Sequence, residues 1–327
     1  MINNSKLDLG PLHDFYELGH AEANFLPAVI EGLSLPQKQL SSKYFYDQKG
    51  SDLFEQITRL PEYYPTRTEI SLLKAHAKEF AELIGPGASL IEFGSGSSNK
   101  VRIILDALQE PSAYLPIDIS KDYLIESAKD LARSYPDLIV IPISADYTRP
   151  LTLPVLPSEL VRVGFFPGST IGNFSRDEAI KFLRTASIYL GAGNGLLIGV
   201  DLKKDTDMLF AAYDDAAGVT ARFNLNILSH INRELGADLD LEGFKHEVRW
   251  EADKGSIEMH LVSKYDQKVS INGHIFQFVA GESIHTEDSH KYTIETFQSL
   301  AEEAGWRSLS HWTDSEDLFS VHYLQVI

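Results

Sequence analysis

The sequence predicts an α/β protein with a doubly wound, Rossmann-like parallel sheet. Three observations lead to this fold class: apolar runs alternate with amphipathic stretches, a glycine-rich turn follows the first run, and acidic residues end the next two. The runs expected as strands are 89–93, 114–119, 138–143, 161–166 and 196–200. The stretches expected as helices between them are 99–108, 121–134 and 176–190. Alternation at this spacing indicates parallel strands with helices on both faces of the sheet.

The C-terminal part of the chain predicts a different ending for this sheet. A helix is expected over 294–304, followed by two strands at 306–312 and 319–326. The short polar turn between these strands suits an antiparallel hairpin and is too short for a crossover helix. A parallel sheet that ends with an antiparallel strand is typical of the class I methyltransferase fold, and this argument rests on fold analogy.

Between residues 201 and 291 the alternation breaks, which predicts a second, smaller domain. Helical patterns at 207–213 and 220–235 lead into alternating runs at 247–250, 257–262 and 274–279. We interpret these as an inserted α+β substrate-binding domain, joined by the aromatic-rich segment 45–65. The predicted domains are therefore 69–201 with 292–327 for the cofactor, and 1–68 with 202–291 for the substrate.

Composition narrows the range of partners. The 327 residues are 43% hydrophobic, and 47 acidic against 29 basic residues give a formal charge of −18. Such a charge disfavours nucleic acid, because phosphate backbones are bound mainly through Lys and Arg. The chain has no cysteine, and we see no apolar signal peptide or membrane-spanning run. We expect a cytoplasmic monomer that acts on a small molecule, with no nucleic acid, membrane or metal partner.

The strongest local motif is the glycine turn Gly94-Ser-Gly96 after the first predicted strand. Glycines at the carboxyl end of a strand permit a tight turn and close approach of a ligand to the backbone. The nicotinamide fingerprint requires a third glycine three residues later, where this chain has Asn99. Its absence weakens the oxidoreductase alternative, and the acidic Glu92 before the turn is typical of methyltransferases.

Acidic residues at the ends of the next two strands support a nucleoside cofactor. Asp118 can accept hydrogen bonds from both ribose hydroxyls, and Asp146 can accept one from the adenine amino group while Tyr147 stacks on the base. Each aspartate alone is more often a helix cap or a turn residue. Three such features at successive carboxyl edges, where open α/β sheets bind ligands, favour binding of S-adenosylmethionine.

Several long strings give a more specific indication. They are Phe45-Tyr-Asp-Gln-Lys-Gly-Ser-Asp-Leu-Phe-Glu-Gln-Ile-Thr-Arg-Leu-Pro-Glu-Tyr-Tyr-Pro-Thr-Arg, Pro167-Gly-Ser-Thr-Ile-Gly-Asn-Phe, Ala212-Tyr-Asp-Asp, Gly218-Val-Thr-Ala-Arg-Phe-Asn and the shorter Thr286-Glu-Asp-Ser. Over nearly its whole length the sequence resembles the histidine Nα-methyltransferases of ergothioneine biosynthesis. The resemblance implies S-adenosylmethionine as cofactor, S-adenosylhomocysteine as product, and trimethylation of L-histidine to hercynine.

The resemblance also implies roles for individual residues. Those implied for the cofactor are Gly94, Lys100, Asp118, Asp146 and Tyr147. Asn173 and Tyr213 are expected at the substrate carboxylate and Tyr63 at the amine, and Gly168 is expected among the substrate-binding residues. Glu287 and Ser289 are expected at the imidazole, with Met259 packed nearby. Tyr46 and Phe54 are similar to aromatic residues near the reacting nitrogen, and Tyr46 is our candidate for proton acceptor, with water as the alternative.

The physical chemistry of these residue types is compatible with the implied roles. A carboxylate and a hydroxyl two residues apart on an extended segment lie on one face, where they can serve both ring nitrogens of an imidazole. Without the resemblance, the sequence of residues 286–289 predicts a solvated loop or a helix N-cap. His285 and His290 flank them, but this spacing alone does not indicate a metal site. Aromatic rings, usually core residues, also attract a trimethylammonium cation.

Three alternatives remain open on the sequence. An N-methyltransferase for tryptophan or a tryptophan derivative could share the carboxylate-binding residues, although indole leaves an acidic imidazole partner without a role. A non-catalytic S-adenosylmethionine-binding regulator would need a blocked substrate pocket, whereas the polar residues expected here are all present. A nicotinamide oxidoreductase is the third alternative.

Overall fold

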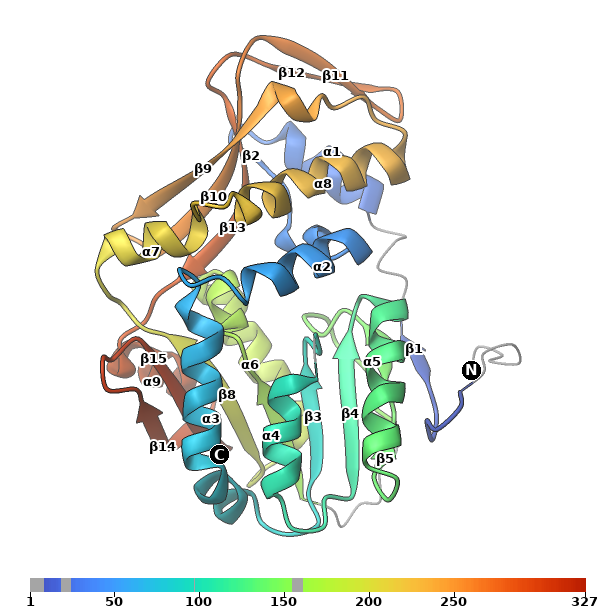
Figure 1. Cartoon of the computed structure of the whole chain (residues 1–327), viewed down its shortest axis with the longest axis vertical. Coiled ribbons are helices and arrows are strands. Elements are labelled where there is room, and N and C mark those ends of the chain that lie inside the picture. The colour runs from blue at the N-terminus through green and yellow to red at the C-terminus, as the bar shows by residue number, and fades with distance from the viewer. Residues whose placement is uncertain (1–8, 19–24, 97, 155–160) are drawn as a thin grey trace. The chain divides into compact units, whose positions relative to one another are not determined.

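The computed structural model describes residues 9–18, 25–96, 98–154 and 161–327, and within them the chain forms two compact units. Unit 1 contains residues 9–18, Thr68–Leu202 and Tyr292–Ile327. Unit 2 contains residues 25–67 and Lys203–Lys291. Figure 1 labels the elements of both units, which are described separately below.

Unit 1 is built on a sheet that has nine strands among the described residues, in the order β1-β6-β4-β3-β7-β8-β15-β14, with β5 beside β4. The strands from β1 to β8 pair in parallel, and β15 pairs antiparallel with both β8 and β14. The predicted doubly wound sheet and its terminal antiparallel hairpin are therefore confirmed. The strands are β1 (Tyr16–Leu18), β3 (Ser89–Phe93), β4 (Ala113–Asp118), β5 (Ile139–Val140), β6 (Ile143–Ala145), β7 (Arg162–Phe166), β8 (Gly195–Asp201), β14 (Trp306–Thr313) and β15 (Phe319–Val326).

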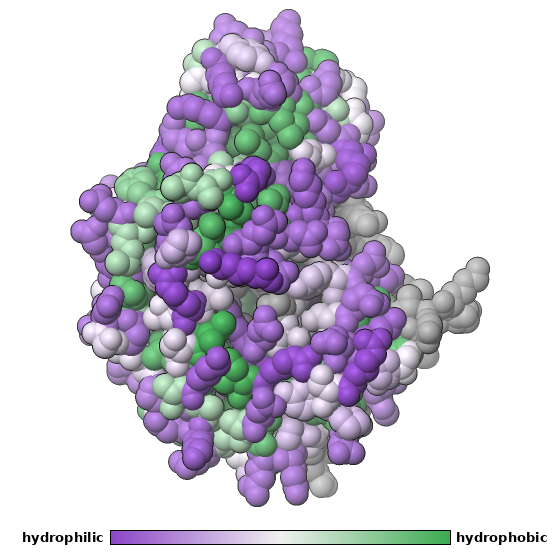
Figure 2. Space-filling model, in the orientation of Figure 1, coloured by the Kyte–Doolittle hydropathy of each residue, from purple (hydrophilic) through white to green (hydrophobic). Residues whose placement is uncertain are grey.

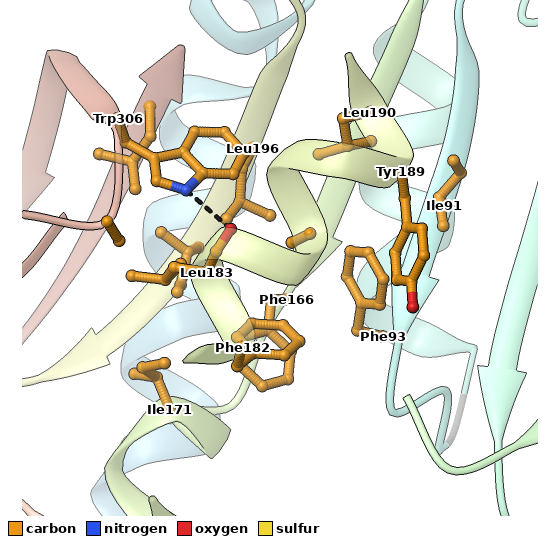
Figure 3. Packing of buried hydrophobic residues seen from close by; sticks show 14 of the residues in the cluster. Ile91, Phe93, Phe166, Ile171, Phe182, Leu183, Tyr189, Leu190, Leu196 and Trp306 are labelled. Atoms are coloured by element: carbon orange, nitrogen blue, oxygen red, sulfur yellow. Dashed lines mark hydrogen bonds between the residues drawn. The ribbon is translucent and has the colours of Figure 1, made fainter. Parts of the chain in front are cut away.

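Helices cover both faces of this sheet because its strands are apolar on both sides. One buried cluster joins the sheet to α3, α4 and α5, which lie in front of the strands in Figure 1. A second cluster joins the other face to α6 and α9. In it the Trp306 indole N–H donates to the Leu183 carbonyl over 3.0 Å (Figure 3). The helices are α3 (Tyr64–Ile84), α4 (Asn99–Ala107), α5 (Lys121–Ser134), α6 (Arg176–Leu190) and α9 (Ile294–Glu303), with the 3-10 turn η3 (Thr170–Asn173).

Two details of unit 1 differ from the sequence prediction. The single strand expected over 138–143 is split into β5 and β6, because Pro142 between them has no N–H for a sheet ladder. Residues 16–18, placed with the substrate domain in the prediction, form β1 and pair with β6 in the large sheet. This strand has only three residues, which is too short for an alternation pattern to be read from the sequence.

Unit 2 contains a four-stranded sheet in the order β2-β13-β10-β9, a separate hairpin of β11 and β12, and four helices among the described residues. The segment 45–65, which fitted no element in the sequence, begins at the last residue of the 3-10 turn η2 and contains α2. The elements are α1 (Phe25–Ser34), β2 (Lys38–Gln39), η2 (Ser42–Phe45), α2 (Gln48–Ile57), α7 (Thr206–Tyr213), α8 (Val219–Leu235), η4 (Leu241–Gly243), β9 (Phe244–Glu251), β10 (Ser256–Ser263), β11 (Gln267–Ile271), β12 (His274–Phe278) and β13 (Ser283–His290).

A β-bulge in β13 decides which side chains share a face of this sheet. Met259 of β10 lies opposite Glu287, and the next residue, His260, lies opposite His285, so Thr286 has no partner in the ladder. The Thr286 hydroxyl lies 2.9 Å from the Met259 carbonyl oxygen. Because a bulge shifts the alternation by one residue, Met259, Glu287 and Ser289 lie on one face, and His285 and Asp288 on the other.

Polar residues cover most of the surface seen in Figure 2, as the strong net charge of the sequence leads one to expect. Among the described residues, no helix is both long and apolar enough to cross a membrane.

Candidate active site

The residues predicted for the cofactor meet at the carboxyl ends of β3, β4 and β6. Gly94 follows β3 with a φ of 75°, a left-handed conformation that favours glycine. A Cβ at this position would lie 3.4 Å from the Tyr147 hydroxyl, so the turn after β3 and the segment after β6 are adjacent. The neighbouring Ser97 of the glycine motif lies outside the described residues. Because Gly94 and Gly96 have no side chains, a nucleoside can approach the backbone of this turn closely.

Two carboxyl groups lie at the same edge. Asp118, the last residue of β4, accepts a hydrogen bond from the Ser120 backbone N–H over 2.8 Å, and burial raises its pKa to about 6. The Asp146 carboxylate accepts from the Thr148 backbone N–H over 3.1 Å. Burial, with the negative charges of these two aspartates, raises the pKa of Tyr147 well above its ordinary value. The edge therefore offers acceptors to hydroxyl and amino groups of a ligand.

Glu92 of β3 lies beneath this edge and makes more contacts than the sequence indicated. It is buried, accepts a hydrogen bond from the Tyr114 hydroxyl, and lies in a small polar cluster with Ser95, whose hydroxyl is 3.0 Å from that of Tyr114. Burial raises the pKa of Glu92 to about 7, although the hydrogen bonds from Tyr114 and Ser95 act in the opposite direction. Tyr114 and Ser95 were not singled out in the sequence, because they are ordinary in a strand and in a turn.

A second cluster in unit 1 joins Lys100 to Gly168 through Glu69. No role for Glu69 could be predicted from the sequence. The Lys100 ammonium lies 2.6 Å from a Glu69 carboxylate oxygen, and the Gly168 N–H donates to both oxygens over 2.9 Å. Glu69 is almost fully buried in α3. The predicted residue Asn173 ends η3, which begins two residues after Gly168. Glu69 thus fixes the loop after β7, while Lys100 already has an anionic partner.

Unit 2 brings together the aromatic residues that the sequence predicted for the substrate. Ring centroids of Tyr46 and Phe54 are 5.7 Å apart, those of Phe54 and Tyr63 are 6.3 Å apart, and those of Tyr63 and Tyr213 are 6.3 Å apart, all edge to face. Phe223 of α8 contacts both Tyr46 and Phe54, and only the structure reveals it. The continuous row of rings presents faces and edges that suit an organic cation.

The α2 helix that carries Phe54 is fixed by one acidic residue. Asp47 caps it by accepting from the Gly50 N–H over 2.7 Å. The same carboxylate accepts from Asn226 over 2.7 Å and pairs with Arg233 over 2.9 Å, both in α8. This arrangement explains why the string that begins at Phe45 folds as a cap and a helix against α8.

At the end of the aromatic row the polar residues begin. The Tyr213 hydroxyl lies 2.7 Å from the Ser289 hydroxyl, and the Lys291 ammonium donates to both, over 2.9 Å and 2.7 Å. Ser289 and Lys291 are almost fully buried. Glu287 lies two residues before Ser289 on the same strand, so segment 286–289 is a strand and not a loop or a helix cap. Burial raises the pKa of Glu287 to about 8, opposed by the charge of Lys291.

Metal-ligand side chains meet on the opposite face of β10 and β13. Glu258, His260 and His285 could each direct one ligand atom so that all lie within 4.8 Å of one another. Two cations already balance this group, since Lys254 lies 2.7 Å from Glu258, and Arg249 lies 3.4 Å from a ring nitrogen of His260. These contacts favour an ion-pair network over a cation site.

The sheet order of unit 1, its antiparallel end and the ligand-accepting edge after β3, β4 and β6 agree with an S-adenosylmethionine-dependent methyltransferase, the class of protein that the family match defines. Residues 25–326 match the family model described as histidine-specific, S-adenosylmethionine-dependent methyltransferase. The chain belongs to this family.

The names of similar proteins agree with this family. The chain is 42% identical to a histidine N-alpha-methyltransferase of Mycolicibacterium smegmatis over 88% of this chain and 90% of the relative. It is 39% identical to a histidine N-alpha-methyltransferase of Mycobacterium tuberculosis over 90% of this chain and 92% of the relative. Ergothioneine biosynthesis protein 1 of Neurospora crassa is 31% identical over 88% of this chain, which spans 33% of that longer protein.

Proposed function

We propose that this enzyme methylates the α-amino nitrogen of L-histidine three times to give hercynine, the trimethylated betaine, in ergothioneine biosynthesis. The observation that carries the proposal is the identity of about 40% with two histidine N-alpha-methyltransferases over nearly the full length of all three chains. The name of the Neurospora crassa relative supports the place in ergothioneine biosynthesis. The number of methyl groups and the roles of individual residues are part of the proposal.

The edge of unit 1 fits S-adenosylmethionine. Tyr147 lies against Gly94, and a Cβ at Gly96 would meet nothing within 4 Å, which leaves space for a ligand at this turn. The Asp118 and Asp146 carboxylates can accept from ribose hydroxyls and the adenine amino group. When bound, the cofactor supplies a sulfonium methyl group whose transfer releases a neutral thioether. Because the leaving group is already activated, the protein contributes mainly by orienting the amine, and effective molarity is the main catalytic term.

In unit 2, we assign the imidazole to Glu287 and Ser289, and we place Tyr213 beside the imidazole site, where its hydroxyl contacts that of Ser289. The row of Tyr46, Phe54, Tyr63 and Tyr213 would receive the amine, whose positive charge grows as methyl groups are added. Each contact between a cation and a ring contributes about 0.5–2 kcal/mol. Gly168 and Asn173 of unit 1 are the remaining residues that we assign to the substrate, and Met259 packs beside Glu287 in the sheet register.

Each transfer requires an unprotonated amine, so a proton must leave the nitrogen before it attacks. Tyr46 is our candidate acceptor, with water as the alternative. If the Tyr46 hydroxyl takes this proton, Tyr46→Phe lowers kcat about 10²-fold or more while the affinity for histidine stays within a few-fold. Turnover by Tyr46→Phe at the wild-type rate across the pH range would refute the tyrosine and leave water.

The first test of the function is calorimetric titration of the protein with histidine in the presence of S-adenosylhomocysteine, with tryptophan as control. We expect saturable binding of histidine and much weaker binding of tryptophan. Mass spectrometry of a reaction with S-adenosylmethionine then counts the methyl groups. Binding of tryptophan in preference to histidine would refute the proposed substrate and leave the fold and cofactor assignment intact.

A further inference from the structure

Lys291, which follows the last residue of β13 by one position, is the starting point. Its side chain is almost fully buried, at 2% exposure, and its ammonium contacts the hydroxyls of both Tyr213 and Ser289. These hydroxyls also contact each other, so the three groups form a closed triangle with sides of 2.7, 2.7 and 2.9 Å. The ammonium lies 4.8 Å from the centre of the Tyr213 ring, within the range of a cation–π contact.

The donors and acceptors in this triangle have only a few arrangements. An ammonium can donate but cannot accept, so both hydroxyl oxygens accept from Lys291. One of the two hydroxyl hydrogens is used in the bond between Tyr213 and Ser289, and the other must point out of the triangle. The phenol is the more acidic hydroxyl and therefore the better donor. Tyr213 then donates to Ser289, and the hydrogen of Ser289 is the one directed outward.

We propose that Lys291 is a positioning residue for histidine methylation, which orients the Ser289 hydroxyl as a hydrogen-bond donor to the basic ring nitrogen of the substrate. This inference rests on the proposed function, because it takes Ser289 as an imidazole-binding residue. The other ring nitrogen carries an N–H, which Glu287 can accept from the same face of β13.

A purely structural role for Lys291 makes a different prediction. Burial of an ammonium is costly, and replacement of a buried charge by an apolar group of similar shape is often neutral or stabilising. Lys291→Met keeps the length of the side chain, and Tyr213 and Ser289 can still bond to each other without Lys291. We therefore expect Lys291→Met to melt at or above the wild-type temperature while it loses affinity for the imidazole ring.

The test compares two ligands and a matched control variant by calorimetry in the presence of S-adenosylhomocysteine. The ligands are histidine and β-(2-thienyl)alanine, an amino acid whose ring has neither an N–H nor a basic nitrogen. The control variant is Lys204→Met, because Lys204 donates to the hydroxyl of Tyr64 over 2.6 Å and lies outside the triangle. Weak binding of the thienyl compound is measured by its competition with histidine.

We expect Lys291→Met to weaken histidine about tenfold, the size of a lost hydrogen bond to a buried group, and the thienyl compound less than twofold. Lys204→Met should leave both affinities near those of the wild type. In a Ser289→Ala background, Lys291→Met should change histidine affinity less than twofold, because the hydroxyl through which Lys291 acts is gone.

Three results would overturn the inference. They are an equal loss for both ligands, an undiminished loss in the Ser289→Ala background, or unchanged histidine affinity in Lys291→Met. A melting temperature far below the wild-type value together with equal losses would assign Lys291 a structural role. Failure of the wild-type protein to bind histidine would instead refute the proposed function, so the two failures are distinguishable.

Discussion

Buried ionisable side chains carry most of the chemical information at the residue scale. Glu92 and Glu69 in unit 1 are almost fully buried and Glu287 in unit 2 is partly buried, and each lies beside specific donors or charges. Burial of such groups is costly and persists where other interactions compensate for it. Each therefore gives a measurable consequence when it is replaced.

Glu287 is predicted to decide which amino acid binds. Glu287→Ala removes the acceptor for the imidazole N–H, so we expect histidine affinity to fall about 10- to 100-fold, while tryptophan affinity stays within twofold. Calorimetry with S-adenosylhomocysteine present measures both. The matched control is Asp288→Ala, because Asp288 lies next to Glu287 but on the opposite face of β13. Equal losses for histidine and tryptophan in Glu287→Ala would contradict the specificity role.

Glu92 is predicted to make the protein less stable as the pH rises. Burial raises its pKa from 4.5 to about 7, so the folded state holds the proton more tightly than the unfolded state. The associated stability is present in full below pH 4.5 and is lost as the pH rises through 7, by up to about 3 kcal/mol. Glu92→Gln should remove this dependence.

The measurement for Glu92 is the melting temperature of the ligand-free protein between pH 4.5 and 8. We expect the difference between Glu92→Gln and the wild type to grow with pH in favour of the variant. A difference that does not change across this range would show that Glu92 keeps its ordinary titration. Glu82→Gln, on the exposed side of α3, controls for the loss of one surface charge.

At the scale of elements, the backbone N–H donors at the start of helix α8 explain the last residue of the string Ala212-Tyr-Asp-Asp. Asp215 is buried and accepts from the N–H groups of Val219 and Thr220, over 2.9 Å and 2.7 Å, at the first turn of the helix. Burial alone would raise the pKa of Asp215, but these backbone donors hold it below its ordinary value. The shift stabilises the fold above the unfolded-state pKa of Asp215 and is lost as the pH falls below it.

Asp215→Ala should therefore destabilise unit 2 by about 1–2 kcal/mol at pH 7, the usual effect of a lost cap. Hydrogen exchange of the first turn of α8 and thermal unfolding would measure the effect. The difference from the wild type should shrink as the pH falls below about 4, because the unfolded state then takes up a proton on Asp215 that the folded state binds less readily. Asp214→Ala, at the exposed neighbouring position, is the control. Equal destabilisation by both variants would contradict the capping role.

Elements with a strong periodic pattern could be predicted, and those without one could not. Four of the five predicted parallel strands, the terminal hairpin, α7 and α8 all follow from apolar periodicity, and the fifth is split at Pro142. The strand β1 is too short to show a pattern, and the bulge at Thr286 depends on its neighbours in space. Similarly, Glu69 occupies an ordinary helical position in the sequence, and its role depends on Lys100 and Gly168, which are distant along the chain. Phe223 and Lys291 were missed for the same reason.

For the whole molecule, the division into two units predicts two separate responses to ligands. S-adenosylhomocysteine at 100 times its Kd should stabilise the folded state by about 2.7 kcal/mol. We expect this stabilisation to slow hydrogen exchange at the carboxyl ends of β3, β4 and β6 in unit 1. Histidine added afterwards should slow exchange in β13 and the end of α7, and tryptophan at the same concentration should not. Protection by histidine that is confined to unit 1 would contradict the assignment of Glu287 and Ser289.

The unpaired Thr286 in β13 has a consequence for how this protein can change over generations. Point substitutions at Glu287 or Ser289 alter one contact at a time. Loss of the single codon for Thr286 would remove the bulge and leave unbroken alternation along the strand, with Glu287 and Ser289 still on one face and His285 and Asp288 on the other. Loss of the codon for Asp288, where the alternation is already regular, would instead turn one end of the strand, so that Glu287 and Ser289 would no longer share a face. Among functional gene copies, loss of one residue should therefore be more strongly depleted at position 288 than at position 286.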